Sequence, residues 1–331
     1  MGRARSTGSA VLRKPHRAVR RWLRGRPVDL APPAAHSHTV VLPDGRLLGF
    51  DDIGDRDGEP LLYFHGFGST RLIRHPDDAI AASLGIRLLA VDRPGIGLSV
   101  SRPGRRLLDF ATDIGHLADT IGLDRFGIVA WSGGGPYALG CAWALPHRVT
   151  QVGLISTPAP LAGPEAAGYA TRFHRVSSRA AEVAPWTVRL AMWRWSRQQR
   201  ADPAQHLDDA IAGMVDADKE ILADPLFRDV MLRNASELYR QGGRGLYDEA
   251  LIMARPWGFP LDEVDTPVRI WHGELDQAVP VGMGKHLERT IPTAHATFLP
   301  GEAHHLLYDR WEEILGEVAQ RSRTRRAARS R

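Results

Sequence analysis

The sequence predicts an α/β protein with a mostly parallel central sheet, flanked by helices and carrying an inserted helical segment. Short apolar runs of strand length alternate with amphipathic helical stretches from about residue 60 to residue 157. The alternation resumes after residue 256, and the residues between the two blocks indicate helices only. Strand–helix–strand repeats of this kind place parallel strands side by side beneath covering helices.

The first block begins with a predicted β-hairpin, because apolar residues flank the Asp44-Gly45 turn in HTVVLPDGRLLGFDDIG. Short apolar runs then predict four strands, at 60–66, 86–92, 126–131 and 149–156. Helices are expected near 76–84, near 107–121 and from Ser132 to about Leu145. These elements and the hairpin make up the first part of the core, residues 37–157.

Residues 158–255 are expected to form a helical cap, since the alternation stops at Pro158-Ala159-Pro160. The core then continues over 256–320, with predicted strands at 267–273 and 295–300 and helices near 281–291 and 305–320. A cap inserted there would lie over the carboxyl ends of the strands, where open α/β sheets bind their ligands.

The net charge of +5 comes from the two ends of the chain. Residues 1–36 hold nine Arg or Lys against Asp29 alone, and residues 321–331 hold six Arg and no acid. We therefore expect a basic N-terminal extension, a basic C-terminal tail and a net acidic body that does not bind nucleic acid. Val19 and Trp22 lie among the arginines of the extension at helical spacing. Two interpretations stay open for it: a solvated arm, or an amphipathic helix in weak contact with a membrane surface.

Several chemistries find no support in the sequence. Cys141 is the only cysteine and lies in an apolar stretch, which predicts a buried thiol. Gly95-Ile96-Gly97 lacks the third glycine of a dinucleotide loop, and the histidine pairs lack a third ligand at metal spacing. No cofactor and no metal are expected. No run approaches the length of a membrane span, so a cytoplasmic location is expected. The oligomeric state stays open.

The stretch VAWSGGGPYALGCA (129–142) places Ser132 between an apolar strand and an alanine-rich helix. Ala130 and Gly134 are small enough to let strand and helix pack closely around a sharp turn. The pattern resembles the nucleophile elbow G-x-S-x-G of the α/β-hydrolase superfamily, with Ala130 in place of the first glycine. Taken alone, the motif leaves open a serine that only caps a helix.

The resemblance covers about residues 38–320 and extends to the groups that a serine nucleophile needs. It implies Asp276, in GELD, as the acid of a catalytic triad and His304, in PGEAHH, as the base. The loop YFHGFGST resembles the His-Gly loop of the superfamily, which implies an oxyanion hole formed by the backbone N–H groups of Phe67 and Gly133. The order Ser132, Asp276, His304 is that of the superfamily.

Other residues compete for these roles. Glu274 is the alternative acid and His305 the rival base, although the superfamily's base comes three residues after a glycine, which selects His304. His65 and Asp92 are expected to support turns rather than to act in catalysis.

A serine nucleophile implies acyl chemistry, so we expect hydrolysis of a small or medium apolar acyl ester through an acyl-enzyme intermediate. Two alternatives stay open: a cofactor-free perhydrolase or C–C hydrolase with the same triad, and a non-catalytic ligand receptor. Within the cap, some side chains could line an apolar pocket or could be core, namely Trp186, Met192, Trp193 and Trp195. The segment ELYRQGGRGLYDE (237–249) resembles a cap segment of uncharacterised bacterial hydrolases, without a known role.

Overall fold

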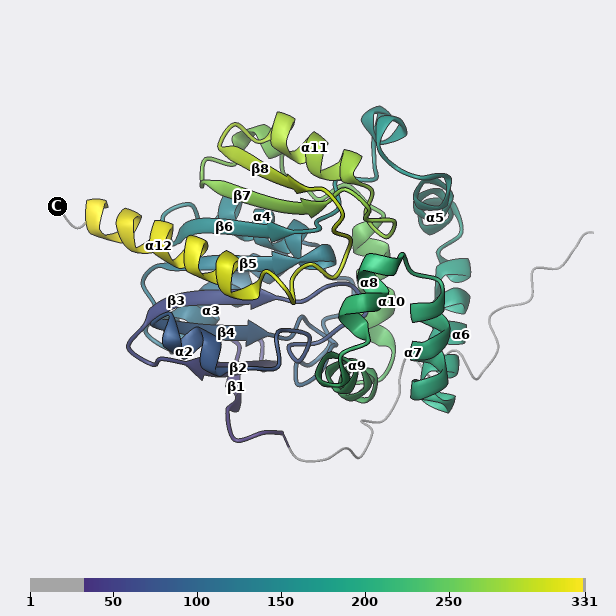
Figure 1. Cartoon of the computed structure of the whole chain (residues 1–331), viewed down its shortest axis with the longest axis horizontal. Helices are drawn as coiled ribbons and strands as arrows, with labels where there is room; N and C mark the ends of the chain where they lie inside the picture. Colours follow the sequence, from purple (N-terminus) through teal and green to yellow (C-terminus); the bar gives the residue numbers. More distant parts are fainter. Residues whose placement is uncertain (1–32, 330–331) are drawn as a thin grey trace, which may run out of the picture.

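The computed structural model describes residues 33–329 and confirms the predicted α/β architecture (Figure 1). Eight strands form one sheet in the order β1-β2-β4-β3-β5-β6-β7-β8. The last six strands in this order are parallel to one another, whereas β1 and β2 form an antiparallel hairpin at the edge. The hairpin turns at Gly45, whose φ of 81° lies in the left-handed region that favours glycine.

The strands lie within a few residues of their predicted positions. They are β1 (Ser37–Val41), β2 (Leu47–Gly54), β3 (Glu59–Phe64), β4 (Ile86–Val91), β5 (Phe126–Trp131), β6 (Val149–Ile155), β7 (Val268–Gly273) and β8 (Ala294–Leu299). Every residue of β3, β5 and β6 is buried, as expected for central parallel strands that are covered on both faces.

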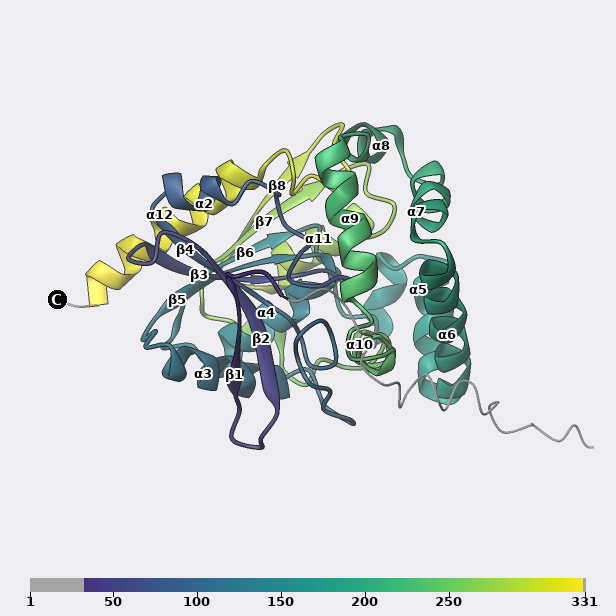
Figure 2. The ribbon, with the colours of Figure 1, turned by 90° about the horizontal axis from the view of Figure 1, so that it is seen from below.

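Helices cover both faces of the sheet (Figure 2). On one face lie α3 (Asp109–Thr120), α4 (Gly135–Ala144) and α11 (Val281–Thr290), and on the other lie α2 (Ala79–Ser83) and α12 (Trp311–Arg329). Each face has its own hydrophobic core: Phe110 and Leu139 belong to the first, and Tyr63 and Trp311 to the second. The sheet is therefore a rigid platform on which loops at the strand ends can be held in place.

Residues 158–255 contribute further helices between β6 and β7, and we call this segment the helical insertion. Its helices are α5 (Arg172–Val183), α6 (Pro185–Ala201), α7 (Pro203–Ala212), α8 (Asp216–Leu222), α9 (Pro225–Glu237) and α10 (Arg244–Met253), with a 3₁₀ turn at η2 (Pro164–Gly168). They lie beyond the carboxyl ends of the parallel strands (Figures 1 and 2). A second 3₁₀ turn, η3 (Leu261–Glu263), leads back to the sheet.

The structure differs from the prediction at both ends. The last helix begins at Trp311 instead of residue 305, because residues 301–310 form a loop that carries both histidines, and it continues to Arg329 through the predicted tail. Ser322 in that stretch is buried and donates to Glu59 at 2.6 Å. At the other end, His36 lies 3.5 Å from Asp51 and so belongs to the folded body. The amphipathic helix considered for the N-terminal extension falls in residues 1–32, outside the described residues.

No helix between residues 33 and 329 is long and apolar enough to cross a membrane.

Candidate active site

Ser132 occupies a strained turn between β5 and α4. Trp131 is still extended, with φ −104° and ψ 137°, whereas Ser132 has a φ of 51°, which residues with a β-carbon rarely adopt. The 3₁₀ turn η1 (Ser132–Gly134) then leads directly into α4. A β-carbon on Gly134 would lie 2.3 Å from the carbonyl oxygen of Phe64, so only glycine fits there. Backbone strain of this kind persists where the surrounding fold enforces it, often at functional sites.

His304 and Asp276 form a buried pair at the end of the sheet. His304 Nδ1 lies 2.8 Å from Asp276 Oδ2, and the other carboxylate oxygen accepts from the backbone N–H of Val279 at 2.7 Å. The carbonyl of His304 in turn accepts a hydrogen bond from the Trp131 indole at 3.0 Å. Since Asp276 holds Nδ1, the ring presents Nε2 as the free acceptor.

The pair alters the proton affinity of the imidazole. Burial by itself would lower the pKa of His304, but the charge of Asp276, its hydrogen bond and the charge of Asp218 together raise that pKa above its ordinary value. A histidine with a raised pKa beside a buried carboxylate is suited to accept a proton and to carry it as imidazolium.

Ser132 and His304 line the same cavity, of about 580 Å³. Ser132 Oγ has no hydrogen-bond partner among residues 33–329 and faces this space. The walls are mainly apolar side chains from the helical insertion and the core: Leu161, Phe173, Val188, Met192, Met253, Val279 and Met283. No Asp, Glu, Lys or Arg of the described chain lines the cavity. The cavity therefore suits an uncharged, apolar ligand.

Phe67 and Gly133 bring two backbones together beside Ser132. Both residues line the cavity, and a β-carbon on Gly133 would lie 2.8 Å from the backbone nitrogen of Phe67. The ring of Phe67 stacks with Trp195 of α6, with the ring centroids 6.2 Å apart. Two adjacent backbone N–H groups next to a nucleophile are the arrangement that stabilises an oxyanion.

The rival residues lie elsewhere. Glu274 is exposed, whereas Asp276, two residues on, is buried against His304. The backbone N–H of His305 donates to Asp218 Oδ1 of α8 at 2.8 Å, and its ring Nδ1 lies 3.1 Å from the same oxygen. His305 does not line the cavity and instead connects the loop at residues 301–310 to the helical insertion.

His65 and Asp92 are fully buried and bound to the backbone, as their expected supporting roles require. His65 Nδ1 lies 2.9 Å from the carbonyl of Gly66, and burial lowers the pKa of its imidazole well below the ordinary value. Asp92 accepts hydrogen bonds from the backbone N–H groups of Arg71 and Leu98 at 2.8 and 2.9 Å. It thereby stabilises the turn after β4.

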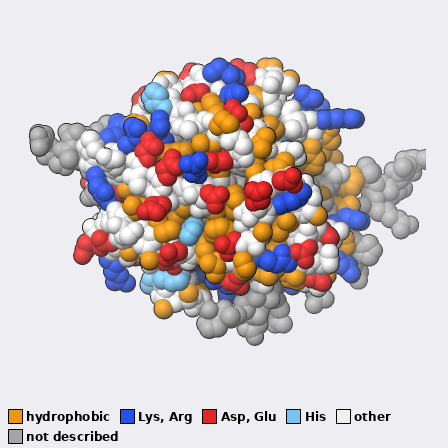
Figure 3. Space-filling view, in the orientation of Figure 1, with side chains coloured by type: hydrophobic (Ala, Val, Ile, Leu, Met, Phe, Trp, Pro, Cys, Tyr) orange, Lys and Arg blue, Asp and Glu red, His pale blue; other side chains and the backbone are white. Residues whose placement is uncertain are grey.

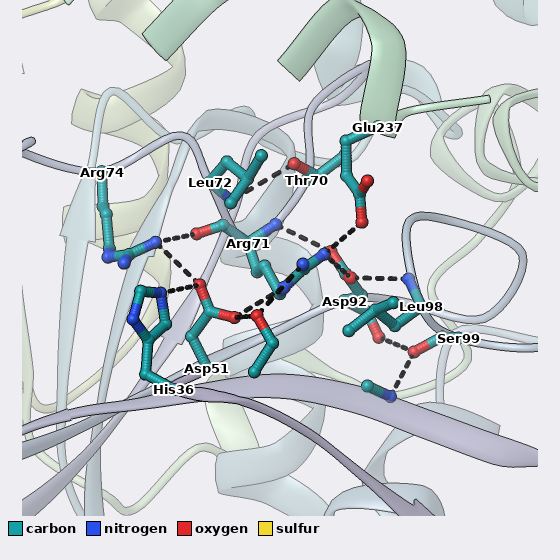
Figure 4. A network of polar contacts seen from close by, with 12 residues as sticks. His36, Asp51, Thr70, Arg71, Leu72, Arg74, Asp92, Leu98, Ser99 and Glu237 are labelled. Atoms are coloured by element: carbon teal, nitrogen blue, oxygen red, sulfur yellow. Dashed lines mark hydrogen bonds and ion pairs between the residues drawn. The ribbon is translucent and has the colours of Figure 1, made fainter. Parts of the chain in front are cut away.

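The segment 237–249 docks the helical insertion on the core through buried charges. Glu237 accepts from Arg71 at 2.6 Å, and Arg71 also binds Asp51 and Asp92 (Figure 4). Glu249 binds Arg93, with a second contact of 3.1 Å. Between these ends, Gly245 packs on Gly95 so closely that a β-carbon would lie 2.2 Å from the Gly95 carbonyl. This segment therefore joins the helical insertion to the core.

Arg93 connects Glu249 to the loop that carries Phe67. Its guanidinium donates to the carbonyl of His65 and, at 2.8 Å, to the carbonyl of Gly66, directly before Phe67. Both Arg93 and its partner Glu249 are fully buried, and the Tyr137 ring lies 4.9 Å below the guanidinium. The position of the Phe67 backbone thus depends on a carboxylate from α10.

Sequence analysis missed two histidines near the site. His272 of β7 lies 2.8 Å from the carbonyl of Val279 and 3.6 Å from Asp276, and so holds the loop that carries the acid. His174 of α5 lines the cavity, and burial lowers the pKa of its imidazole. His272 stands directly before the Gly-Glu-Leu-Asp motif, whereas no pattern within the helical insertion marks His174.

The four candidate pocket residues of the insertion have separate positions. Met192 lines the cavity, and Trp195 packs over the loop at Phe67 and donates to His206 at 3.0 Å. Trp186 is 46% exposed, and Trp193 is partly buried without lining the cavity. The apolar wall is thus made by methionine and aliphatic residues more than by tryptophan.

A mostly parallel sheet with a serine at a strained strand–helix turn and a buried His–Asp pair at its carboxyl end defines the α/β-hydrolase class. The chain belongs to the alpha/beta hydrolase fold family, whose model matches residues 59–310. Solved structures agree on the fold. A hydrolase from Pseudomonas aeruginosa PA01 superposes with a TM-score of 0.64 at 19% identity, covering 87% of this chain and 99% of the other. An esterase from Rhodococcus sp. ECU1013 superposes with a TM-score of 0.62 at 22% identity, covering 88% of this chain and 99% of the other.

Two curated relatives match a shorter region. The chain is 34% identical over 117 residues to the dihydrolipoyllysine-residue acetyltransferase component of an acetoin cleaving system from Pseudomonas putida, covering 34% of this chain and 30% of the relative. It is 32% identical over 126 residues to a non-heme chloroperoxidase from Streptomyces lividans, covering 37% of this chain and 45% of the relative. The chain thus spans less than half the length of both relatives.

Proposed function

We propose that this protein is a serine hydrolase that cleaves small or medium apolar acyl esters through an acyl-enzyme intermediate. The observation that carries the proposal is that Ser132, in its strained turn, shares one apolar cavity with His304, whose ring is held by buried Asp276. The similarity of the fold to esterases supports the same reaction class.

In this mechanism Ser132 attacks the acyl carbon while His304 Nε2 takes its proton. Asp276 keeps the ring oriented and stabilises the imidazolium. The backbone N–H groups of Phe67 and Gly133 bind the oxyanion, each contributing about 3 kcal/mol in comparable sites. His304 then returns the proton to the leaving alcohol, and water attacks the acyl-enzyme by the same route in reverse.

The walls of the cavity support the choice of substrate. No charged side chain of the described chain lines the space, which disfavours phosphate esters and other anions. Phosphoryl transfer calls for a metal or for several cations around the phosphate. The methionine and aliphatic lining favours an apolar acyl group.

The test is Ser132-dependent hydrolysis of p-nitrophenyl esters from acetate to decanoate, with p-nitrophenyl phosphate and aminoacyl anilides alongside. We expect turnover of esters, loss in Ser132→Ala and labelling of Ser132 by a fluorophosphonate. Faster turnover of anilides than of every ester would contradict the proposal in favour of a peptidase. If no compound reacts and Ser132 resists the phosphonate, the result would favour a non-catalytic ligand receptor.

A second candidate function is cofactor-free perhydrolysis, favoured by the similarity to a non-heme chloroperoxidase and to a bromoperoxidase structure from Bacillus anthracis. Here hydrogen peroxide replaces water as the acceptor of the acyl group, so a carboxylic acid and peroxide give a peracid and water. Peracid formation from acetate and peroxide, lost in Ser132→Ala and faster than ester hydrolysis, would favour this function.

A further inference from the structure

The outer face of α5 and α6 exposes an unusual number of large hydrophobic side chains. Of the ten that are exposed between residues 33 and 329, five lie on these two helices: Phe173, Val176, Val183, Trp186 and Leu190. Phe173 is 75% exposed. In Figure 3, hydrophobic side chains gather at the right-hand side of the molecule, over α5. Exposed apolar patches on soluble proteins usually mark interaction sites.

These side chains form one surface, which we call the α5–α6 face. On α5, Phe173, Val176 and Val183 project within an arc of about 80°, since residues three and ten positions apart lie on one side of a helix. On α6, Trp186 and Leu190 are separated by about one turn. The two helices pack against each other. The apolar side chains therefore lie on neighbouring ridges instead of being scattered.

The same face is strongly basic. Residues 172–200 contain seven arginines and only one carboxylate, Glu182. Arg179 pairs with Glu182 at 2.6 Å, and no other arginine of this stretch has a carboxylate within 4.0 Å in the described part of the chain. Arg189 is half-buried over the Tyr247 ring, but the other five arginines are exposed and available to an anionic partner, although the body of the protein is net acidic.

The α5–α6 face borders the cavity that contains Ser132. Phe173 lines the cavity while most of its ring is exposed, and Ala191 of α6 both lines the cavity and is exposed. A partner that covers this face would therefore lie at one rim of the cavity. A substrate held in the apolar part of that partner would have a short path into the cavity that contains Ser132.

We infer that the α5–α6 face docks on an anionic lipid surface and that acyl substrates enter the cavity from it. A second copy of the chain would place arginines against arginines, so charge disfavours self-association through this face. An anionic membrane instead offers phosphates to the arginines and hydrocarbon to Phe173 and Trp186. The docking itself is independent of the proposed function, whereas the entry of acyl substrates rests on it.

Sedimentation of the full chain with lipid vesicles tests the docking. The chain should bind vesicles of phosphatidylglycerol, bind phosphatidylcholine vesicles much less, and be released by salt. The variant Val176→Ser/Trp186→Ser should partition about tenfold more weakly, because both side chains leave the bilayer interface. Neither side chain lines the cavity, so hydrolysis of soluble p-nitrophenyl acetate should be unchanged.

A matched control removes two exposed apolar side chains elsewhere. Val41 and Leu47 pair across the β1–β2 hairpin and are 69% and 37% exposed, so Val41→Ser/Leu47→Ser should bind vesicles like the wild type. Charge reversal in Arg172→Glu/Arg194→Glu should abolish the preference for phosphatidylglycerol.

Three results would overturn the inference: equal binding of both vesicle types, undiminished binding by the α5–α6 variants, or equal loss in the hairpin control. Undiminished binding would assign any lipid contact to the basic N-terminal residues instead. A chain that binds vesicles through the α5–α6 face but hydrolyses no acyl ester would retain the docking and refute the proposed function. Circular dichroism of each variant checks that it is folded.

Discussion

Adjacent histidines in one loop have different surroundings. His304 faces the cavity and binds Asp276, whereas His305 contacts Asp218 of α8. The two side chains point in different directions because they are adjacent in a loop. Each therefore meets a carboxylate from a different part of the fold, Asp276 after β7 or Asp218 of α8. The chemistry of each ring is therefore set by its partner and not by its residue type.

We expect His304→Ala to abolish ester hydrolysis and His305→Ala to reduce it only modestly. Removal of His304 deletes the only ring in the described part of the chain that shares the cavity with Ser132 and is bound to a buried carboxylate, whereas removal of His305 loosens the contact with α8. Steady-state kinetics of both variants, with thermal melts, distinguish the effects. Loss of turnover in His305→Ala alone would reverse the assignment.

The pH profile should report the raised pKa of His304. The ring must be neutral to accept the serine proton, so kcat/KM should fall as the pH drops through this pKa. Because the partners of His304 raise the pKa above 6.5, the midpoint of the acidic limb should lie above 6.5. Stopped assays from acidic to alkaline pH measure it, and a midpoint below 6.5 would contradict the assignment.

In Asp276→Asn the charge that raises this pKa is gone, while burial still lowers it. The acidic limb should therefore move to lower pH, and kcat should fall by about 10⁴-fold, the order found for this change in other Ser-His-Asp triads. Glu274→Gln is the matched control, because Glu274 is exposed beside the same loop and should leave both quantities unchanged.

At the scale of elements, α10 positions a loop that belongs to the sheet. Glu249 of α10 holds Arg93, and Arg93 holds the carbonyls of His65 and Gly66 just before Phe67. Glu249 thus contributes to the geometry of the proposed oxyanion hole although it does not itself line the cavity. The cost of this arrangement is a buried ion pair, whose rupture leaves an uncompensated charge.

We expect Glu249→Gln to lower kcat at least tenfold with little change in KM, because the transition state depends on the Phe67 N–H more than the ground state does. Hydrogen exchange at the Phe67 and Gly68 amides should accelerate in the same variant. Both measurements are made at a temperature where melts show the variant to be folded.

Glu237→Gln is the control for general destabilisation. It breaks the equivalent buried pair with Arg71, whose guanidinium reaches Asp51 and Asp92 but no carbonyl of the Phe67 loop. We expect a loss of stability with kcat nearly unchanged, and the loss should be smaller than that of a fully broken pair because Asp51 and Asp92 still compensate the Arg71 charge. Equal losses of kcat in both variants would show that Glu249 acts only through stability.

At the scale of the whole molecule, the proposed site draws only on residues from 65 to 304. Removal of residues 1–32 should therefore leave hydrolysis of soluble esters within about twofold of the full chain, since the cut spares His36 and its contact with Asp51. Kinetics and melting of the shortened chain test this. A folded product without turnover would show that the first 32 residues contribute to the site.

The sequence by itself determined the sheet, the helical insertion and the candidate site residues. Strand lengths, turn residues and the Ser132 motif depend on the chemistry of residues that are neighbours in the sequence, so the sequence alone predicts them. Even so, the loop at 301–310 and the extension of α12 to Arg329 escaped prediction. Both depend on contacts with distant residues, such as that of Ser322 with Glu59.

Only the tertiary structure decided what the residues of the insertion contact. Glu237 and Glu249 resemble ordinary surface carboxylates in the sequence, yet burial beside Arg71 and Arg93 makes them joints between the insertion and the core. Likewise, only the fold separates Met192, in the cavity wall, from Trp186, on the outer face. The physical reason is that the partner of a buried charge or an apolar side chain is chosen by three-dimensional packing, and helical periodicity alone leaves that partner undefined.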